Sequence, residues 1–132
     1  MLLITGFTTA ILAIYLIFLS ILTIRARRRF KVSLADNGEP DLIKFIRAQG
    51  NLTEFAPIFL ILLLLVEINH LLPVFWLWMI VLIFILGRCL HSVSLILVEP
   101  KTFNLRIFAM TCTFSSILLL ACVLLINFIQ KL

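Results

Sequence analysis

Three polar residues at the start of a long apolar run have types and a spacing that suit ligand binding. Arg47, Asn51 and Glu54 are four and three positions apart, so on a helix they lie on one face over two turns. A cation, an amide and a carboxylate at the edge of a hydrocarbon layer usually face a bundle interior or a cavity, where they have a function. This triad is the first candidate site.

A second group of polar residues follows in later apolar segments. Arg88 and His91 are three positions apart and share a helix face, and Arg106 opens the last segment. Burying a charge in the middle of a membrane helix costs about 2.5–3.5 kcal/mol, so these groups must pair with one another or with a ligand. Glu54 is the one carboxylate expected at this depth. The excess positive charge therefore favours an anionic ligand held by bidentate guanidinium groups.

A self-contained network is the alternative interpretation of the same residues. In it Glu54 pairs with Arg47 or Arg88, and His91 bonds to a backbone carbonyl group. Such a network would have only a structural role. It weakens as an explanation of the whole set because the cations outnumber the carboxylates.

The composition places these residues in a membrane protein. The chain has 132 residues, of which 64% are apolar and 13% charged, against about 45–50% and about 25% in soluble domains. Each of four apolar segments exceeds the roughly 20 residues that cross a bilayer core. We predict an all-α integral membrane protein, a single domain over residues 1–132 with four transmembrane helices. The predicted spans are residues 2–24, 41–68, 73–95 and 105–130.

The positions of lysine and arginine predict the orientation. They crowd the first connector, Arg25 to Pro40, and Lys101 and Arg106 lie in or beside the third, whereas the second, Asn69 to Leu72, has none. The positive-inside tendency places connectors one and three in the cytosol and both termini on the non-cytosolic side. The net charge of +5 reflects mainly this signal, and no nucleic-acid-binding motif accompanies it.

The three cysteines, Cys89, Cys112 and Cys122, lie inside predicted spans at no metal-like or redox-motif spacing. We expect them to be small apolar residues of the bundle, and we expect no metal site.

Glutathione has the groups that these polar residues could bind. Arginines would bind its carboxylates, Glu54 its ammonium group, and Asn51 or His91 its peptide groups. An arginine beside the thiol would lower the thiol pKa from about 8.5 and raise the thiolate fraction at neutral pH. The thiolate could then attack an electrophile delivered from the lipid.

Three motifs give the chain a resemblance to a known family. They are Arg-Ala-Gln-x-Asn-x-x-Glu-x-x-Pro at 47–57, Gly-Arg-x-x-His at 87–91 and Arg-Arg-x-Phe-[Arg/Lys]-Val at 27–32. The chain resembles the MAPEG family (membrane-associated proteins in eicosanoid and glutathione metabolism), small four-helix membrane proteins that assemble as trimers. Its short loops are similar to those of bacterial members. The inner membrane of a bacterium is the expected location, with the endoplasmic reticulum as the alternative.

The resemblance implies glutathione as a cosubstrate, bound between neighbouring subunits of a homotrimer with its polar end toward the cytosolic face. By position, the implied glutathione-binding residues are Arg27, Arg28, Arg47, Asn51, Glu54, Arg88 and His91. Arg106 corresponds to the family's thiolate-stabilising arginine and is the expected catalytic residue. The second implied partner is a lipophilic substrate or a lipid from the bilayer.

Three positions depart from the family's glutathione-using enzymes. Leu95 and Met110 occupy places where tyrosine is common, Phe55 occupies a third, and Tyr15, the only tyrosine, is expected far from the cluster. Three functions therefore stay open. They are a glutathione transferase or peroxidase, a non-catalytic lipid-binding or lipid-presenting protein, and a small multidrug exporter. The exporter ranks last because the essential carboxylate of such transporters usually lies on the first helix, and the first span here has no charge.

Overall fold

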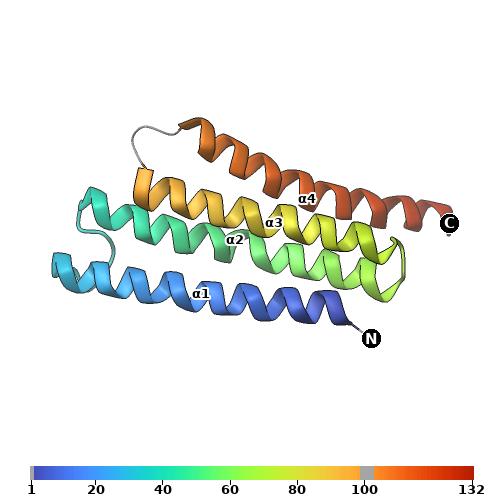
Figure 1. Ribbon diagram of the computed structural model, residues 1–132, viewed down its shortest axis with the longest axis horizontal. Coiled ribbons are helices and arrows are strands. Elements are labelled where there is room, and N and C mark those ends of the chain that lie inside the picture. Colours follow the sequence, from blue (N-terminus) through green and yellow to red (C-terminus); the bar gives the residue numbers. More distant parts are fainter. Residues whose placement is uncertain (1, 99–102) are drawn as a thin grey trace.

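Four long helices make up the part of the chain that the structure describes. The computed structural model describes residues 2–98 and 103–132, and in it successive helices run antiparallel, so that both termini lie at one end of the bundle (Figure 1). The helices are α1 Leu3–Phe30, α2 Pro40–Ile68, α3 Val74–Val93 and α4 Phe103–Gln130, and a π-helical turn, η1 Ser94–Val98, continues α3. In the described part of the chain the prediction of an all-helical bundle is confirmed.

The helices are long and apolar enough to cross a bilayer. Each of the four contains a window of mean hydropathy between 2.0 and 2.4, and each is at least 24 residues long when η1 is counted with α3. Helices satisfy their own backbone hydrogen bonds, which is what a hydrocarbon layer requires of a spanning segment. The chain is a multi-pass membrane protein.

The end of α1 differs from the sequence-based expectation. The first connector was expected from Arg25, but α1 continues to Phe30 and places the basic run on the helix itself. Arginine favours helix, and cations in the last turn interact well with the negative end of the helix dipole. Lys31 then ends the helix in a left-handed conformation with φ of 56°. Lys101, assigned to the third connector, lies outside the described residues.

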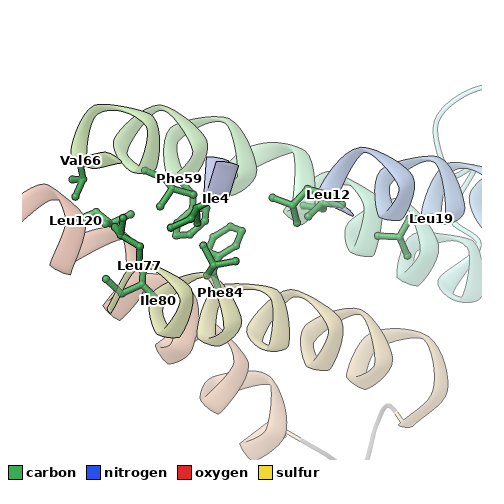
Figure 2. Packing of buried hydrophobic residues seen from close by; sticks show 12 residues of the cluster. Ile4, Leu12, Leu19, Phe59, Val66, Leu77, Ile80, Phe84 and Leu120 are labelled. Atoms are coloured by element: carbon green, nitrogen blue, oxygen red, sulfur yellow. The ribbon is translucent and has the colours of Figure 1, made fainter. Parts of the chain in front are cut away.

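An apolar core fills the bundle along most of its length (Figure 2). Helix α1 packs mainly on α2, whereas α4 packs on α3 and α2. At the centre, the rings of Phe59 and Phe84 stack with centroids 3.7 Å apart and planes 4° from parallel. In a bilayer this packing stabilises the bundle by van der Waals contact. The hydrophobic effect contributes little, because an apolar side chain that leaves the acyl chains for the core stays in an apolar environment.

A buried carboxylate ties the start of α1 to the end of α2. Glu67 accepts hydrogen bonds from the backbone amides of Ile4 at 2.9 Å and Thr5 at 2.8 Å, and from the Thr5 hydroxyl at 2.5 Å. Amides in the first turn of a helix have no partner within the helix, and that end of the helix dipole favours an anion. Glu67, which the sequence analysis left unassigned, therefore caps α1.

Candidate functional site

A pocket of about 510 Å³ lies where α2 and α4 begin. That is the end of the bundle away from the termini (Figure 1). The start of α2, the end of α3 with η1, and the start of α4 form its walls. Its lining residues are Pro40, Ile43, Lys44, Arg47, Asn51, His91, Leu95, Arg106 and Met110. Four of the residues predicted from the sequence, on three different helices, thus converge on one cavity. We call it the cationic pocket.

The charges that line the cationic pocket are positive. Lys44, Arg47 and Arg106 are cationic, and none of the described lining residues is acidic. Lys44 also pairs with Asp41 at 2.8 Å on the outer side of α2. Guanidinium and ammonium groups that converge in this way bind carboxylates and phosphates.

Glu54 lies beside the cationic pocket rather than in its lining. Its Oε1 atom is 4.0 Å from Nη1 of Arg47, and both side chains are more than half exposed. This long contact between exposed groups is a weak ion pair. The pairing of Glu54 with Arg47 expected in the self-contained network is thus present as a weak contact, and no ion pair joins Glu54 to Arg88 among the described residues.

Arg88 lies behind the cationic pocket and is only 2% exposed. Its guanidinium group donates to Oδ1 of Asn51 and to Oγ1 of Thr113. The rings of Phe55 and Phe84 flank it, with centroids 5.3 and 5.9 Å from Cζ. Neutral acceptors thus bind the two terminal nitrogens of this buried cation, and its charge adds to the positive potential of the pocket.

Gly87 allows α4 to approach α3 closely at this level. A Cβ atom at Gly87 would lie 2.9 Å from the carbonyl oxygen of Ala109 and 3.2 Å from Oγ1 of Thr113. Small residues permit such close approach of membrane helices. The glycine of the Gly-Arg motif therefore brings Thr113 within reach of the neighbouring Arg88.

His91 lines the cationic pocket and is 6% exposed. Its Nδ1 atom is buried and has no hydrogen-bond partner within residues 2–98 and 103–132, and the same holds for Nε of Arg88. The backbone carbonyl expected as the partner of His91 in the self-contained network is therefore not at Nδ1. Buried polar atoms are almost always paired, so these two nitrogens are exceptions within the described part of the chain.

Arg27 and Arg28 lie apart from the cationic pocket within one chain. They line a separate pocket of about 320 Å³ at the end of α1, together with Lys31. Arg27 donates to the backbone carbonyl of Ala35 at 2.6 Å, which fixes it against the connector. Within one chain the structure does not bring these two arginines to the cationic pocket.

The positions that depart from the family pattern lie at the site. Leu95 and Met110 both line the cationic pocket, and Phe55 contacts the buried guanidinium group of Arg88. Tyr15 was expected far from the cluster, but it lines an apolar pocket of about 400 Å³ with Cys89 and Ser92, which follow Arg88 and His91 in α3.

Two residues of the site were not found by sequence reasoning. Lys44 lines the cationic pocket, and its position seven residues before Asn51, two helical turns away, was a signal for it. Thr113 binds Arg88 but looks like any threonine of a membrane helix in the sequence. Only the approach of α4 to Gly87 reveals its role.

Comparisons with known proteins agree with the motifs. A search of curated proteins found no match. The MAPEG family model matches residues 5–126, which is nearly the whole chain and includes every residue of the cationic pocket. The resemblance inferred from the three motifs is confirmed, and the chain belongs to the MAPEG family.

Proposed function

We propose that the protein binds glutathione in the cationic pocket and acts as a membrane glutathione transferase or peroxidase. The family includes such enzymes and other members as well. The observation that carries the proposal is the convergence of Lys44, Arg47 and Arg106 with Asn51 and His91 on one cavity. Its volume of about 510 Å³ is within the range of roughly 300–1,000 Å³ that is usual for small-molecule sites.

The donor set fits the chemistry of glutathione. Two carboxylates of the tripeptide match the cations of the pocket, and its peptide groups match Asn51 and His91. Glu54, next to Arg47, is placed to bind the ammonium group at the rim. In this proposal Arg106 faces the thiol, lowers the thiol pKa and holds the sulfur as a thiolate. The thiolate then attacks a lipophilic electrophile or a lipid hydroperoxide.

A neighbouring subunit completes the site in this proposal. The side chains of Arg47 and Glu54 are 62% and 52% exposed, although they belong to a spanning helix. Charged groups in a membrane helix rarely face lipid, so a second copy of the chain is the expected cover. A homotrimer would also bring Arg27 or Arg28 of one subunit to the cationic pocket of the next. The pocket would face the cytosol, as the basic end of α1 predicts.

A second candidate function is presentation of a lipid without catalysis. It is favoured by Leu95 and Met110, which give the cationic pocket two apolar walls where related enzymes often have tyrosine. The apolar pocket of about 400 Å³ between α1 and α3 could hold an acyl chain. For an exporter of cationic drugs, by contrast, the converging arginines would repel the cargo.

Calorimetric titration of glutathione into the detergent-purified protein tests the proposal. We expect the wild type to bind, and we expect Arg47→Ala or Glu54→Ala to weaken binding because each removes a charge-assisted hydrogen bond. Such a bond is worth about 1.5–3 kcal/mol, or roughly 10- to 150-fold in affinity. The trimer should remain intact in both variants.

Arg25→Ala and Glu39→Ala are matched controls, since both residues lie outside the cationic pocket. Unchanged binding in both Arg47→Ala and Glu54→Ala would contradict the site assignment. If the wild type itself binds no glutathione, the lipid-presenting function becomes the better explanation.

A further inference from the structure

The carboxamide of Asn51 is held in one orientation from behind. Its Oδ1 atom accepts a hydrogen bond from Nη1 of Arg88, which also lies 3.4 Å from the Asn51 backbone carbonyl oxygen. An arginine side chain has donors only, so the atom of Asn51 that faces it must be the oxygen. The Nδ2 group then donates to Sδ of Met110, 3.9 Å away, and Met110 lines the cationic pocket.

Arg88 is fixed in its turn by α4. Its other terminal nitrogen donates to Oγ1 of Thr113, whose own proton goes to the carbonyl oxygen of Ala109 at 3.1 Å. The two terminal nitrogens of the guanidinium group therefore donate to one acceptor on α2 and one on α4. We call this arrangement of Asn51, Arg88 and Thr113 the clamp. Among the described residues no carboxylate lies within 4.0 Å of Arg88, so its charge is not neutralised by an ion pair.

We propose that Arg88 is a positioning residue, which turns the Asn51 carboxamide so that it presents only its amide donor to the cationic pocket. The pocket then meets its ligand with cations and an amide donor, and it selects the carboxylate and carbonyl acceptors of that ligand. This inference rests on the proposed binding of glutathione. It replaces direct contact between Arg88 and the ligand, the role implied by family resemblance, with action through Asn51.

The position of Arg88 favours action through Asn51 over direct contact with the ligand. Direct contact requires the guanidinium group at the pocket wall, but Arg88 is 2% exposed and does not line the cationic pocket. Met110 and Asn51 lie between Arg88 and the cavity. Sδ of Met110 is 3.5 Å from Nη2 of Arg88, and Oδ1 of Asn51 accepts a hydrogen bond from Nη1. A residue with this placement acts on the ligand through its neighbour.

A double-mutant cycle on glutathione affinity tests the inference. Arg88→Lys keeps the charge but cannot grip Asn51 and Thr113 together, so we expect glutathione to bind about tenfold more weakly. In the Asn51→Ala background the same substitution should have less than about a twofold effect, because the group through which it acts is gone. An equal loss in both backgrounds would show that Arg88 contacts the ligand and would overturn the inference.

Thr113→Val provides a milder second variant in case Arg88→Lys does not fold. It removes the acceptor on α4 without touching the cationic pocket, and we expect about a threefold loss of affinity. Thr111→Val is the matched control, since the exposed Thr111 hydroxyl bonds only to the carbonyl oxygen of Ile107 among the described contacts. Equal affinities in the two threonine variants would contradict the clamp.

A readout without ligand separates this inference from the proposed function. In protein labelled with ¹⁵N-asparagine, the side-chain amide signal of Asn51 is identified by its loss in Asn51→Asp. We expect that signal to move in Thr113→Val and to stay in Thr111→Val. An unmoved signal refutes the clamp even if glutathione binds. A signal that moves in Thr113→Val but not on addition of glutathione to the wild type upholds the clamp and refutes the proposed function.

Discussion

The two ends of the bundle treat buried polar groups differently. At the end with the termini, the carboxylate of Glu67 receives three hydrogen bonds from the first turn of α1. At the other end, His91 and Arg88 each keep a buried nitrogen without a partner in the described chain. Both ends place charge inside a membrane protein, but only at the end with the termini does the described chain supply a hydrogen-bond partner to each buried polar atom named here. We call the other end the incomplete end.

The comparison teaches how to separate structural from functional polarity in a membrane bundle. A charge whose partners are all supplied by the chain has a structural role, as Glu67 has at the start of α1. At the other end, cations line a cavity of about 510 Å³ with no acidic residue in the described lining, which is the composition expected of a site for an anionic ligand.

Removing the Glu67 carboxylate should have the largest effect on stability. In Glu67→Ala the amides of Ile4 and Thr5 lose their acceptor, and we expect the free energy of unfolding to fall by about 3 kcal/mol. Glutathione binding should survive in the folded fraction. Thermal unfolding in detergent, followed by circular dichroism, measures the change. The control is Glu54→Ala, which should leave the unfolding temperature unchanged. The reverse pattern would remove the distinction between the two ends.

Removing a cation from the incomplete end should change chemistry more than stability. In Arg106→Ala we expect glutathione to bind still, while the pKa of its bound thiol rises by about one unit or more, since a nearby opposite charge lowers such a pKa by about 1–3 units. The thiolate fraction then falls near neutral pH and recovers as the pH rises. Ultraviolet absorbance of the thiolate across pH follows this, with Arg25→Ala as control. Lost binding with an unchanged thiol pKa would contradict the role.

The sequence was sufficient to predict the fold and the convergence of the pocket residues. A hydrocarbon layer permits few backbone structures, so four long apolar segments had to be helices. With short connectors these helices alternate in direction, which brings the starts of α2 and α4 to the end of α3. Arg47, His91 and Arg106 meet for this reason.

What the sequence could not predict depends on distances between helices. A spacing of three residues places Arg88 and His91 on one face, yet His91 lines the cationic pocket and Arg88 lies behind it. That difference follows from the approach of α4 to Gly87, which no single segment encodes. The partner of Glu67 was hidden for the same reason, because it is the first turn of a different helix. The placement of Arg27 and Arg28 in a neighbour's site stays a prediction.

A gain of binding at the incomplete end is the smallest effect that we expect, and it tests the comparison most directly. Met110 lines the cationic pocket, with Sδ at 3.9 Å from Nδ2 of Asn51, in a place where related enzymes often have tyrosine. Met110→Tyr would add a hydroxyl group to a wall that now offers only a thioether. One neutral hydrogen bond contributes about 0.5–1.5 kcal/mol, so we expect glutathione to bind about two- to tenfold more tightly.

Met110→Phe is the matched control for this gain, because it adds the ring without the hydroxyl group. Calorimetric titration should give a higher affinity for Met110→Tyr than for Met110→Phe, and the difference isolates the added hydrogen bond. Equal affinities would mean that the ring does not face the ligand. The ligand would then need no further hydrogen-bond donor from this wall. The only groups without a partner at this end, among the described residues, would be the buried nitrogens of His91 and Arg88.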